Sequence, residues 1–280
     1  MSIFVMSVVL FAAMMHASWN AMIKSGLDKL TDTILLSVGA AVVSILIIPF
    51  LPFPAAASWP WLGFSIFMQV AYYCLLASVY KKGDFSFAYP LMRGSAPLFT
   101  AIATTLLLDE TLSKQGWLAI LMICGGIICL FIDNLFKKSI QQSVVFLALL
   151  NATVIAAYTL LDGMGVRVAG NTLSYILWVF LLNGLGMIGV GFFVQPQKMK
   201  QLPPSLWLKG LMSGSLSLCS YGLALWAMTK APIALVAGLR ETSILFGMAI
   251  ATFFLKERFG IARFFAVVMI MAGVILMKTR

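Results

Sequence analysis

The stretch that decides the fold is residues 238–260, GLRETSILFGMAIATFFLKERFG, because it repeats an earlier part of the chain. At an offset of 147 residues it lies, without a gap, on residues 91–113, LMRGSAPLFTAIATTLLLDETLS. Arg240 then falls on Arg93, and both stretches share the pair Leu-Phe five residues further on. The chain therefore carries an internal duplication.

The composition on either side of this repeat is that of a membrane protein. Hydrophobic residues make up 62% of the chain and charged residues 10%, against about 45–50% and about 25% in soluble domains. Continuous apolar runs of about 20 residues, the length of a helix that crosses a bilayer, favour helices over a β-barrel. They predict ten transmembrane helices, near 2–24, 30–52, 58–80, 84–108, 113–133, 143–163, 171–194, 205–229, 231–255 and 260–278.

The duplication divides these ten helices into two repeats of five, residues 1–138 and 139–280. Because five is odd, the second repeat enters the membrane with the opposite orientation, as in many secondary transporters. The predicted fold is an all-α membrane protein with two inverted five-helix repeats. The apolar N-terminal run is expected to be the first of these helices rather than a cleaved signal.

The basic residues predict an orientation. The formal net charge is +10, but Lys and Arg occur in ones and twos at helix ends, so no nucleic-acid partner is expected. The odd-numbered breaks between predicted helices hold 12 Lys and Arg, and the opposite side holds five. By the positive-inside rule the odd-numbered breaks are cytoplasmic and both termini are outside, in a multi-pass protein of the cell (inner) membrane.

Two motifs resemble a known family. Each half has an L-x-E motif followed by an apolar helix that contains glycine, and the first helix ends in HASWNAMIKSG, residues 16–26. The chain resembles the EamA-type branch of the drug/metabolite transporter superfamily. This resemblance implies a ten-helix transporter of small polar metabolites with a central cavity between its halves. The substrate stays open, because the superfamily carries amino acids, amines, sugars, nucleotide-sugars and cationic drugs.

Three charged residues lie at membrane depth. Arg240 is roughly 13 Å below Pro232 at 1.5 Å per residue, and Arg93 is about as deep in the fourth predicted helix. An arginine costs at least about 2.5–3.5 kcal/mol near the middle of the hydrocarbon core, so we expect a function. We predict that Arg93 and Arg240 face a cavity and bind an anionic group of the substrate, with Glu241 as counter-charge. The alternative is a structural ion pair between Glu241 and one of the arginines.

The single histidine of the chain is also deep. His16 and Asn20 share one face of the first helix, with Trp19 beside them. His16, Trp19 and Lys24 match the spacing of a glutamate, a tryptophan and a lysine in the small multidrug resistance branch. That resemblance implies that His16 occupies the position of the proton-coupling, substrate-binding glutamate. A histidine is never anionic but titrates near neutral pH, so it is a candidate proton-coupling group; the alternative is a neutral histidine bonded to a neighbouring helix.

Aromatic and acidic residues complete the candidate site. Tyr158 and four residues of the third and eighth predicted helices are expected to form aromatic walls of the cavity. These four are Tyr72, Tyr73, Tyr221 and Trp226. The alternative is that they pack against other helices or face lipid. Asp162 is expected to bridge Arg167 near a helix end, with the cavity as the alternative. Glu110 and Glu257 are expected to act at the helix boundaries.

These features predict a secondary active transporter of a zwitterion or small anion, such as an amino acid, that works by alternating access and is open to proton coupling. The alternatives are a lipid-carrier flippase and an exporter of amines or cationic drugs; the duplication disfavours a passive channel. Without H-E-x-x-H, G-x-S-x-G, paired carboxylates or a P-loop, we expect no enzyme activity, ATP hydrolysis, metal or cofactor. The expected partners are a small-molecule substrate and the lipid bilayer, with a monomer and a homodimer both compatible.

Overall fold

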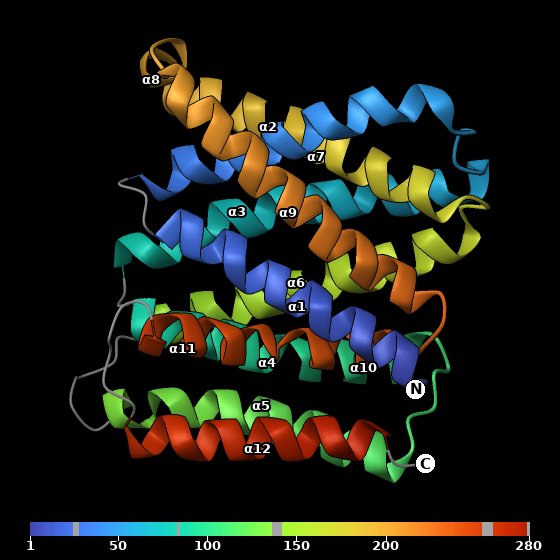
Figure 1. Cartoon of the computed structure of the whole chain (residues 1–280), viewed down its shortest axis with the longest axis vertical. Helices are drawn as coiled ribbons and strands as arrows, with labels where there is room; N and C mark the ends of the chain where they lie inside the picture. The colour runs from blue at the N-terminus through green and yellow to red at the C-terminus, as the bar shows by residue number, and fades with distance from the viewer. Residues whose placement is uncertain (25–27, 83–84, 136–141, 254–259, 279–280) are drawn as a thin grey trace.

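The computed structural model describes residues 1–24, 28–82, 85–135, 142–253 and 260–278 (Figure 1). Over this part of the chain the regular structure is helical, without strands. Two 3₁₀ turns, η1 (Ile48–Phe50) and η2 (Ala56–Ser58), lie between the second and third helices. The α-helices are α1 (Ile3–Lys24), α2 (Lys29–Ile47), α3 (Trp59–Lys82), α4 (Phe85–Leu107), α5 (Lys114–Leu135), α6 (Gln142–Val168), α7 (Thr172–Val194), α8 (Pro196–Lys200), α9 (Pro204–Met228), α10 (Ile233–Arg240), α11 (Ser243–Phe253) and α12 (Ile261–Lys278).

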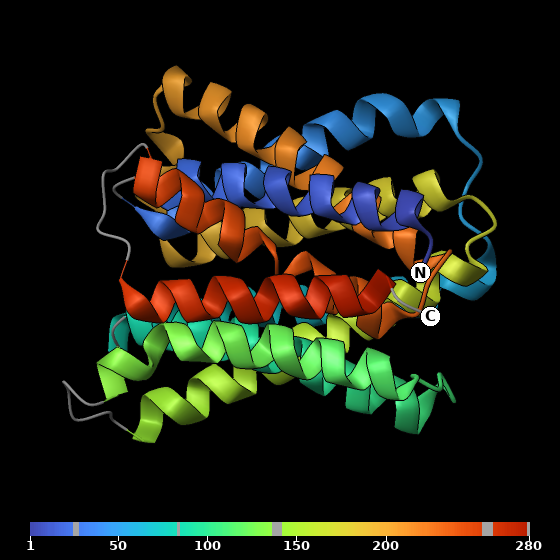
Figure 2. The ribbon, with the colours of Figure 1, turned by 60° about the horizontal axis from the view of Figure 1, so that its bottom comes forward.

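The long helices run between two ends of the molecule. The start of α1 and the end of α12 lie at the same end, and α8 lies at the other (Figure 1). Turned by 60°, the helices are seen to overlie one another in layers (Figure 2). The sequence-predicted boundary between the two repeats, at residues 138 and 139, lies outside the described residues.

Many of these helices suit a membrane. Within the described residues, seven segments are long and apolar enough to cross one, and α5 holds a shorter apolar stretch, Lys114–Leu130. The all-helical membrane fold is confirmed at this level. The seven segments are Ile3–Ile23, Lys29–Phe50, Gln142–Val168, Thr172–Val194, Pro204–Met228, Ile233–Ile250 and Ile261–Lys278.

The ninth predicted helix is interrupted, which the sequence did not indicate. α10 ends at Arg240, the residues Glu241 and Thr242 form a turn, and α11 begins at Ser243. The corresponding helix of the first half, α4, is continuous even though it contains Pro90 and Pro97. A helix break at membrane depth is tolerated where it is buried in protein or lines a cavity, and here Arg240 and Glu241 are both buried.

α5 and α12 pack closely, and the contact is reciprocal: a glycine of each helix lies against the backbone of an alanine of the other. A Cβ on Gly126 of α5 would lie 3.0 Å from the carbonyl oxygen of Ala266, and a Cβ on Gly273 of α12 would lie 2.8 Å from that of Ala119. The repeat alignment pairs Gly126 with Gly273 and Ala119 with Ala266. Small residues allow this close approach of helices, and Figures 1 and 2 show the two helices side by side.

α2 and α9 also approach through glycine. A Cβ on Gly214 of α9 would overlap the backbone of Leu36 and Ala40, and a Cβ on Gly39 of α2 would overlap the carbonyl oxygen of Gly210. The atoms in the way belong to the backbone, so no side-chain rotation can make room. Glycine at these positions therefore sets the distance between a helix of the first half and a helix of the second.

Candidate substrate-binding site

A cavity of about 80 Å³ lies among seven helices from both halves of the chain. It exceeds the roughly 10–15 Å³ that one water molecule needs. Every residue that lines it is polar or aromatic. The lining residues are His16, Trp19 and Asn20 of α1, Gln69, Tyr72 and Tyr73 of α3, Tyr89 and Arg93 of α4, Tyr158 of α6, Phe180 of α7, Ser217 and Tyr221 of α9, and Arg240 of α10.

Arg93 connects the cavity to the helix break. Its Nε lies 2.9 Å from Oε2 of Glu241, and both side chains are nearly fully buried. The ion pair that the sequence left as an alternative is therefore present. Glu241 itself does not line the cavity.

Arg240 has a different environment. It is the last residue of α10, where the partial negative charge of a helix C-terminus favours a cation. Its guanidinium carbon lies 4.8 Å from the centre of the Tyr221 ring, a cation–π contact. Within the described part of the chain no carboxylate forms an ion pair with it. One of the two buried cations is thus neutralised by Glu241, and the other meets the cavity with an aromatic partner.

His16 lies against Arg93. Its Nε2 is 3.4 Å from Nη2 of Arg93, and because a guanidinium can only donate, Nε2 accepts and carries no proton in this contact. Trp19 packs edge-on against the imidazole with ring centres 4.7 Å apart. The Asn20 side chain donates back to the His16 carbonyl oxygen at 2.8 Å. α1 thus presents His16, Trp19 and Asn20 to the cavity, and the imidazole of His16 lies next to the guanidinium of Arg93.

The predicted tyrosines form a connected wall. Tyr158 lies between Tyr72 and Tyr221, with ring centres 6.0 Å and 6.3 Å away. Tyr73 lines the cavity as well. Trp226 instead packs edge-on against Phe4 and does not line it.

Four lining residues were missed by sequence reasoning, and helical spacing could have found three of them. Gln69 precedes Tyr73 by four residues, Tyr89 precedes Arg93 by four, and Ser217 precedes Tyr221 by four, so each shares a helix face with a predicted residue. No comparable signal marks the fourth, Phe180 of α7.

The expected bridge between Asp162 and Arg167 is wrong. Asp162 is fully buried and accepts hydrogen bonds from Gln69, Tyr175 and Tyr221. The cause is the length of α6, which ends at Val168 rather than near residue 163. Asp162 therefore lies about 9 Å inside the helix, at 1.5 Å per residue.

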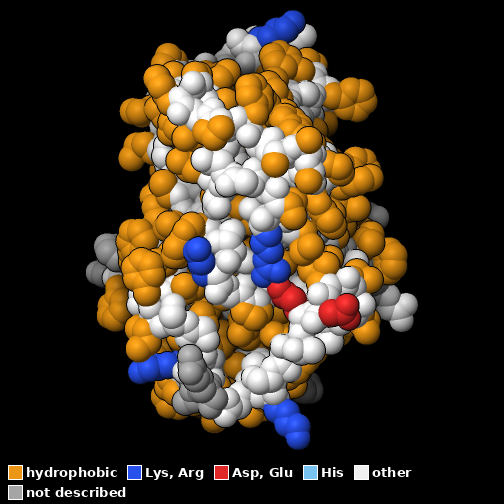
Figure 3. Space-filling view, turned by 90° about the vertical axis from the view of Figure 1, so that its right-hand side faces the viewer, with side chains coloured by type: hydrophobic (Ala, Val, Ile, Leu, Met, Phe, Trp, Pro, Cys, Tyr) orange, Lys and Arg blue, Asp and Glu red, His pale blue; other side chains and the backbone are white. Residues whose placement is uncertain are grey.

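Arg167 instead joins elements at the end of the molecule that holds both chain ends. Its Nη1 lies 2.6 Å from Oε1 of Glu110, and it also donates to the carbonyl oxygens of Met228 and Ala231. Glu110 accepts from the backbone N–H of Ile233 at 3.1 Å. The predicted boundary role of Glu110 is confirmed; Glu257 lies outside the described residues. Figure 3 looks onto this end and shows its charged side chains gathered among hydrophobic ones.

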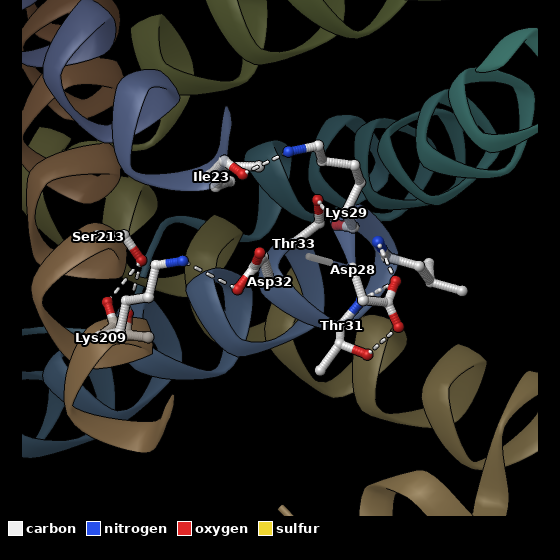
Figure 4. Close-up of polar contacts among 10 residues, drawn as sticks. Ile23, Asp28, Lys29, Thr31, Asp32, Thr33, Lys209 and Ser213 are labelled. Atoms are coloured by element: carbon white, nitrogen blue, oxygen red, sulfur yellow. Dashed lines mark hydrogen bonds and ion pairs between the residues drawn. The ribbon is translucent and has the colours of Figure 1, made fainter. Parts of the chain in front are cut away.

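The opposite end has two ion pairs of its own. Asp28 caps α2 and pairs with Lys198 of α8. Asp32 pairs with Lys209 of α9 at 3.3 Å, and Figure 4 shows this pair beside the Asp28 cap. Burial raises the pKa of Asp28, but hydrogen bonds from Lys198 and Thr31 lower it by more, so the net pKa lies below its usual value. Both pairs join α2 to helices of the second half.

The comparisons with known proteins agree with this architecture. The model of the EamA-like transporter family matches twice, over residues 3–132 and 142–279. A solved crystal structure shares the fold over 98% of this chain and 95% of its own, with a TM-score of 0.74 and 15% sequence identity. No curated protein matches the chain.

The helices, the apolar spans and the polar cavity together define a multi-pass membrane protein of a transporter class. The chain belongs to the EamA-like transporter family, within the drug/metabolite transporter superfamily.

Proposed function

We propose that this chain is a secondary active transporter that carries a small zwitterion or anion, such as an amino acid, by alternating access. The observation that carries this proposal is Arg240, a buried guanidinium that lines the cavity without a carboxylate partner among the described residues. A fixed cation at such a site attracts an anionic group and disfavours a cationic drug or amine. Because one chain encloses the whole cavity, a monomer is sufficient for this function.

The proposed architecture is ten transmembrane helices in two inverted repeats of five, residues 1–138 and 139–280. The reciprocal contact of α5 and α12 and the double match of the family model support it. α10 and α11 would act as one discontinuous helix, a feature typical of transporter binding sites. The odd-numbered breaks would be cytoplasmic and both termini outside, in the inner membrane.

The contacts at the two ends supply a route to alternating access. Glu110 with Arg167 at one end, and Asp28 with Lys198 and Asp32 with Lys209 at the other, join the two proposed repeats. In the proposed cycle one set of contacts opens while the other holds, so the cavity faces one side at a time.

A ligand screen tests the proposed substrate class. A compound that binds only the folded protein stabilises it by RT ln(1 + [L]/Kd), about 2.7 kcal/mol at 100 times Kd. We expect glycine, glutamate or inorganic phosphate to raise the thermal stability of the purified protein, and tetraethylammonium to have no effect. Stabilisation by the ammonium ion alone would favour the cation exporter instead.

His16 is the proposed proton-coupling residue on α1, and its exchange for glutamine tests this role. An amide oxygen can still accept from Arg93 but cannot titrate. Transport into proteoliposomes is expected to depend less on pH in His16→Gln than in the wild type. A variant that keeps the whole pH dependence would remove His16 as a coupling group.

A further inference from the structure

A carboxyl group lies directly behind the cavity wall. Asp162 of α6 has no exposed surface. Its Oδ2 accepts from the Tyr221 hydroxyl at 2.7 Å and from Gln69 Nε2 at 3.0 Å, and its Oδ1 accepts from the Tyr175 hydroxyl at 3.3 Å. All three donors are neutral, and no ion pair in the described part of the chain includes Asp162. A buried carboxylate without a cation is costly, so a proton is a natural partner.

The surroundings hold this carboxyl group in place. Gln69 also donates to Ser65 Oγ at 3.1 Å and accepts from Asn183 Nδ2 at 2.7 Å. Its amide is therefore oriented with the nitrogen toward Asp162. Gln69 and Tyr221 line the cavity, whereas Asp162 does not. Only one layer of side chains separates the carboxyl group from the cavity.

Tyr221 links Asp162 to the cationic site. Its hydroxyl donates to Asp162, and its ring faces the guanidinium of Arg240. When Asp162 is ionised, it and Glu241 balance the charges of Arg93 and Arg240. When Asp162 binds a proton, the site gains one net positive charge.

We infer that Asp162 is a proton-binding site that controls anion binding at Arg240 through the Tyr221 hydroxyl. The Tyr221 hydroxyl passes its hydrogen to Oδ2 of Asp162, and the Tyr221 oxygen takes a proton from water in the cavity. The new O–H of Asp162 donates to the Tyr221 oxygen, and the new Tyr221 hydrogen points toward the cavity, where it can donate to an anion beside Arg240. Release of the proton reverses each step, and no other bond changes.

Proton and anion then favour each other's binding, because coupling between two sites is reciprocal. Other titratable or charged groups surround Asp162. Tyr175 faces it from α7 and Tyr158 lies one turn earlier on α6, while α3 offers only the neutral Gln69 and Ser65. Arg240 of α10 lies beyond Tyr221, and the other cavity-lining groups that carry or accept charge are Arg93, Tyr89, Tyr72, Tyr73 and His16.

Infrared difference spectroscopy of the purified full-length protein in lipid nanodiscs tests the proton site without any substrate. We expect the C=O band of a protonated carboxyl group to be lost as the pH is raised, to be absent in Asp162→Asn and to shift in Tyr221→Phe. The control Asp32→Asn, a buried carboxylate paired with Lys209, should keep the band. A band that persists in Asp162→Asn, or no titrating band in the wild type, would overturn the inference. If Asp162→Asn does not fold, an unshifted band in Tyr221→Phe would do so.

A binding assay tests the coupling to the anion, with glutamate as the probe. On a His16→Gln background, which removes the imidazole, glutamate should bind at least about fivefold more weakly at alkaline than at acid pH, the lower end of typical coupling. Asp162→Asn should bind equally at both, because an amide does not titrate in this range. A pH dependence that survives in Asp162→Asn overturns the inference.

This assay rests on the proposed function, but the two proposals fail separately. If neither glutamate nor the other anionic and zwitterionic probes binds while the Asp162 band titrates as expected, the proposed substrate class is wrong and the proton site is supported.

Discussion

Exchange of Arg240 for glutamine is expected to abolish the stabilisation that an anionic or zwitterionic probe should give to the wild-type protein. The guanidinium lines the cavity and lacks a carboxylate partner among the described residues, so the anionic group of the substrate would be its main charged contact. Truncation of one partner of a buried charge pair costs about 2–5 kcal/mol, and 2 kcal/mol corresponds to roughly 30-fold weaker binding. Isothermal titration calorimetry on the purified variant measures this loss.

Two further variants separate local from general effects. Lys230→Gln removes the same formal charge from an exposed position after α9 and should bind the probe as the wild type does. The double variant Arg93→Gln, Glu241→Gln removes the ion pair without leaving a buried charge alone, and should weaken binding by less than Arg240→Gln. A full response in Arg240→Gln, or an equal loss in Lys230→Gln, would show that Arg240 is not the anchor.

The second large effect is expected at the contact of α2 and α9. A side chain at Gly214 would overlap the backbone of Leu36 and Ala40, so Gly214→Leu must push the helices apart. We expect the free energy of unfolding to fall by at least about 3 kcal/mol, at the upper end of overpacking effects. Thermal unfolding followed by tryptophan fluorescence measures the change.

The matched control is Gly189→Leu in α7. Gly189 is exposed, and a Cβ there would meet no atom within 4 Å. Leucine also favours a helix more than glycine does, by up to about 1 kcal/mol, so stability should be unchanged or slightly higher. Equal losses in both variants would indicate that glycine matters for some reason other than the close approach of α2 and α9.

The helices could be predicted from the sequence more reliably than their interruptions. Long apolar runs require helices in lipid, because the backbone must satisfy its own hydrogen bonds. The break after Arg240 has no comparable signal, since the two residues that form it are Glu241 and Thr242 and neither is a helix breaker such as proline or glycine. By contrast, α4 contains two prolines and stays continuous. The break depends on contacts with distant helices, among them the ion pair of Glu241 with Arg93.

The end of α6 shows how a small error at a boundary changes the interpretation of a residue. The sequence placed Asp162 near a helix end, but the helix continues to Val168, and the signals for its end are Gly170 with a positive φ and Asn171, which caps α7. A few residues of extra helix move a carboxyl group from the lipid interface to the interior of the protein.

Much of the lining of the cavity was predicted from the sequence, but the contacts of these residues were not. Eight of the nine proposed substrate-binding residues line it, and the ninth, Glu241, pairs with a lining residue. A polar side chain deep in an apolar membrane helix is rare and costly, so its position alone marks it as a candidate for function. Which partner it meets depends on the rotation of helices far apart in the sequence, as the contact of His16 with Arg93 illustrates.

The interruption between α10 and α11 exists in one half only, which affects the proposed cycle. Two identical halves would give inward-facing and outward-facing forms of equal energy. Here Glu241 stands where the first half has Gly94, so in the proposed cycle the two forms would differ in energy and the empty carrier would have a preferred resting orientation. Such a preference would set how fast the carrier works from each side, while the solute gradients alone would set the direction of net flux.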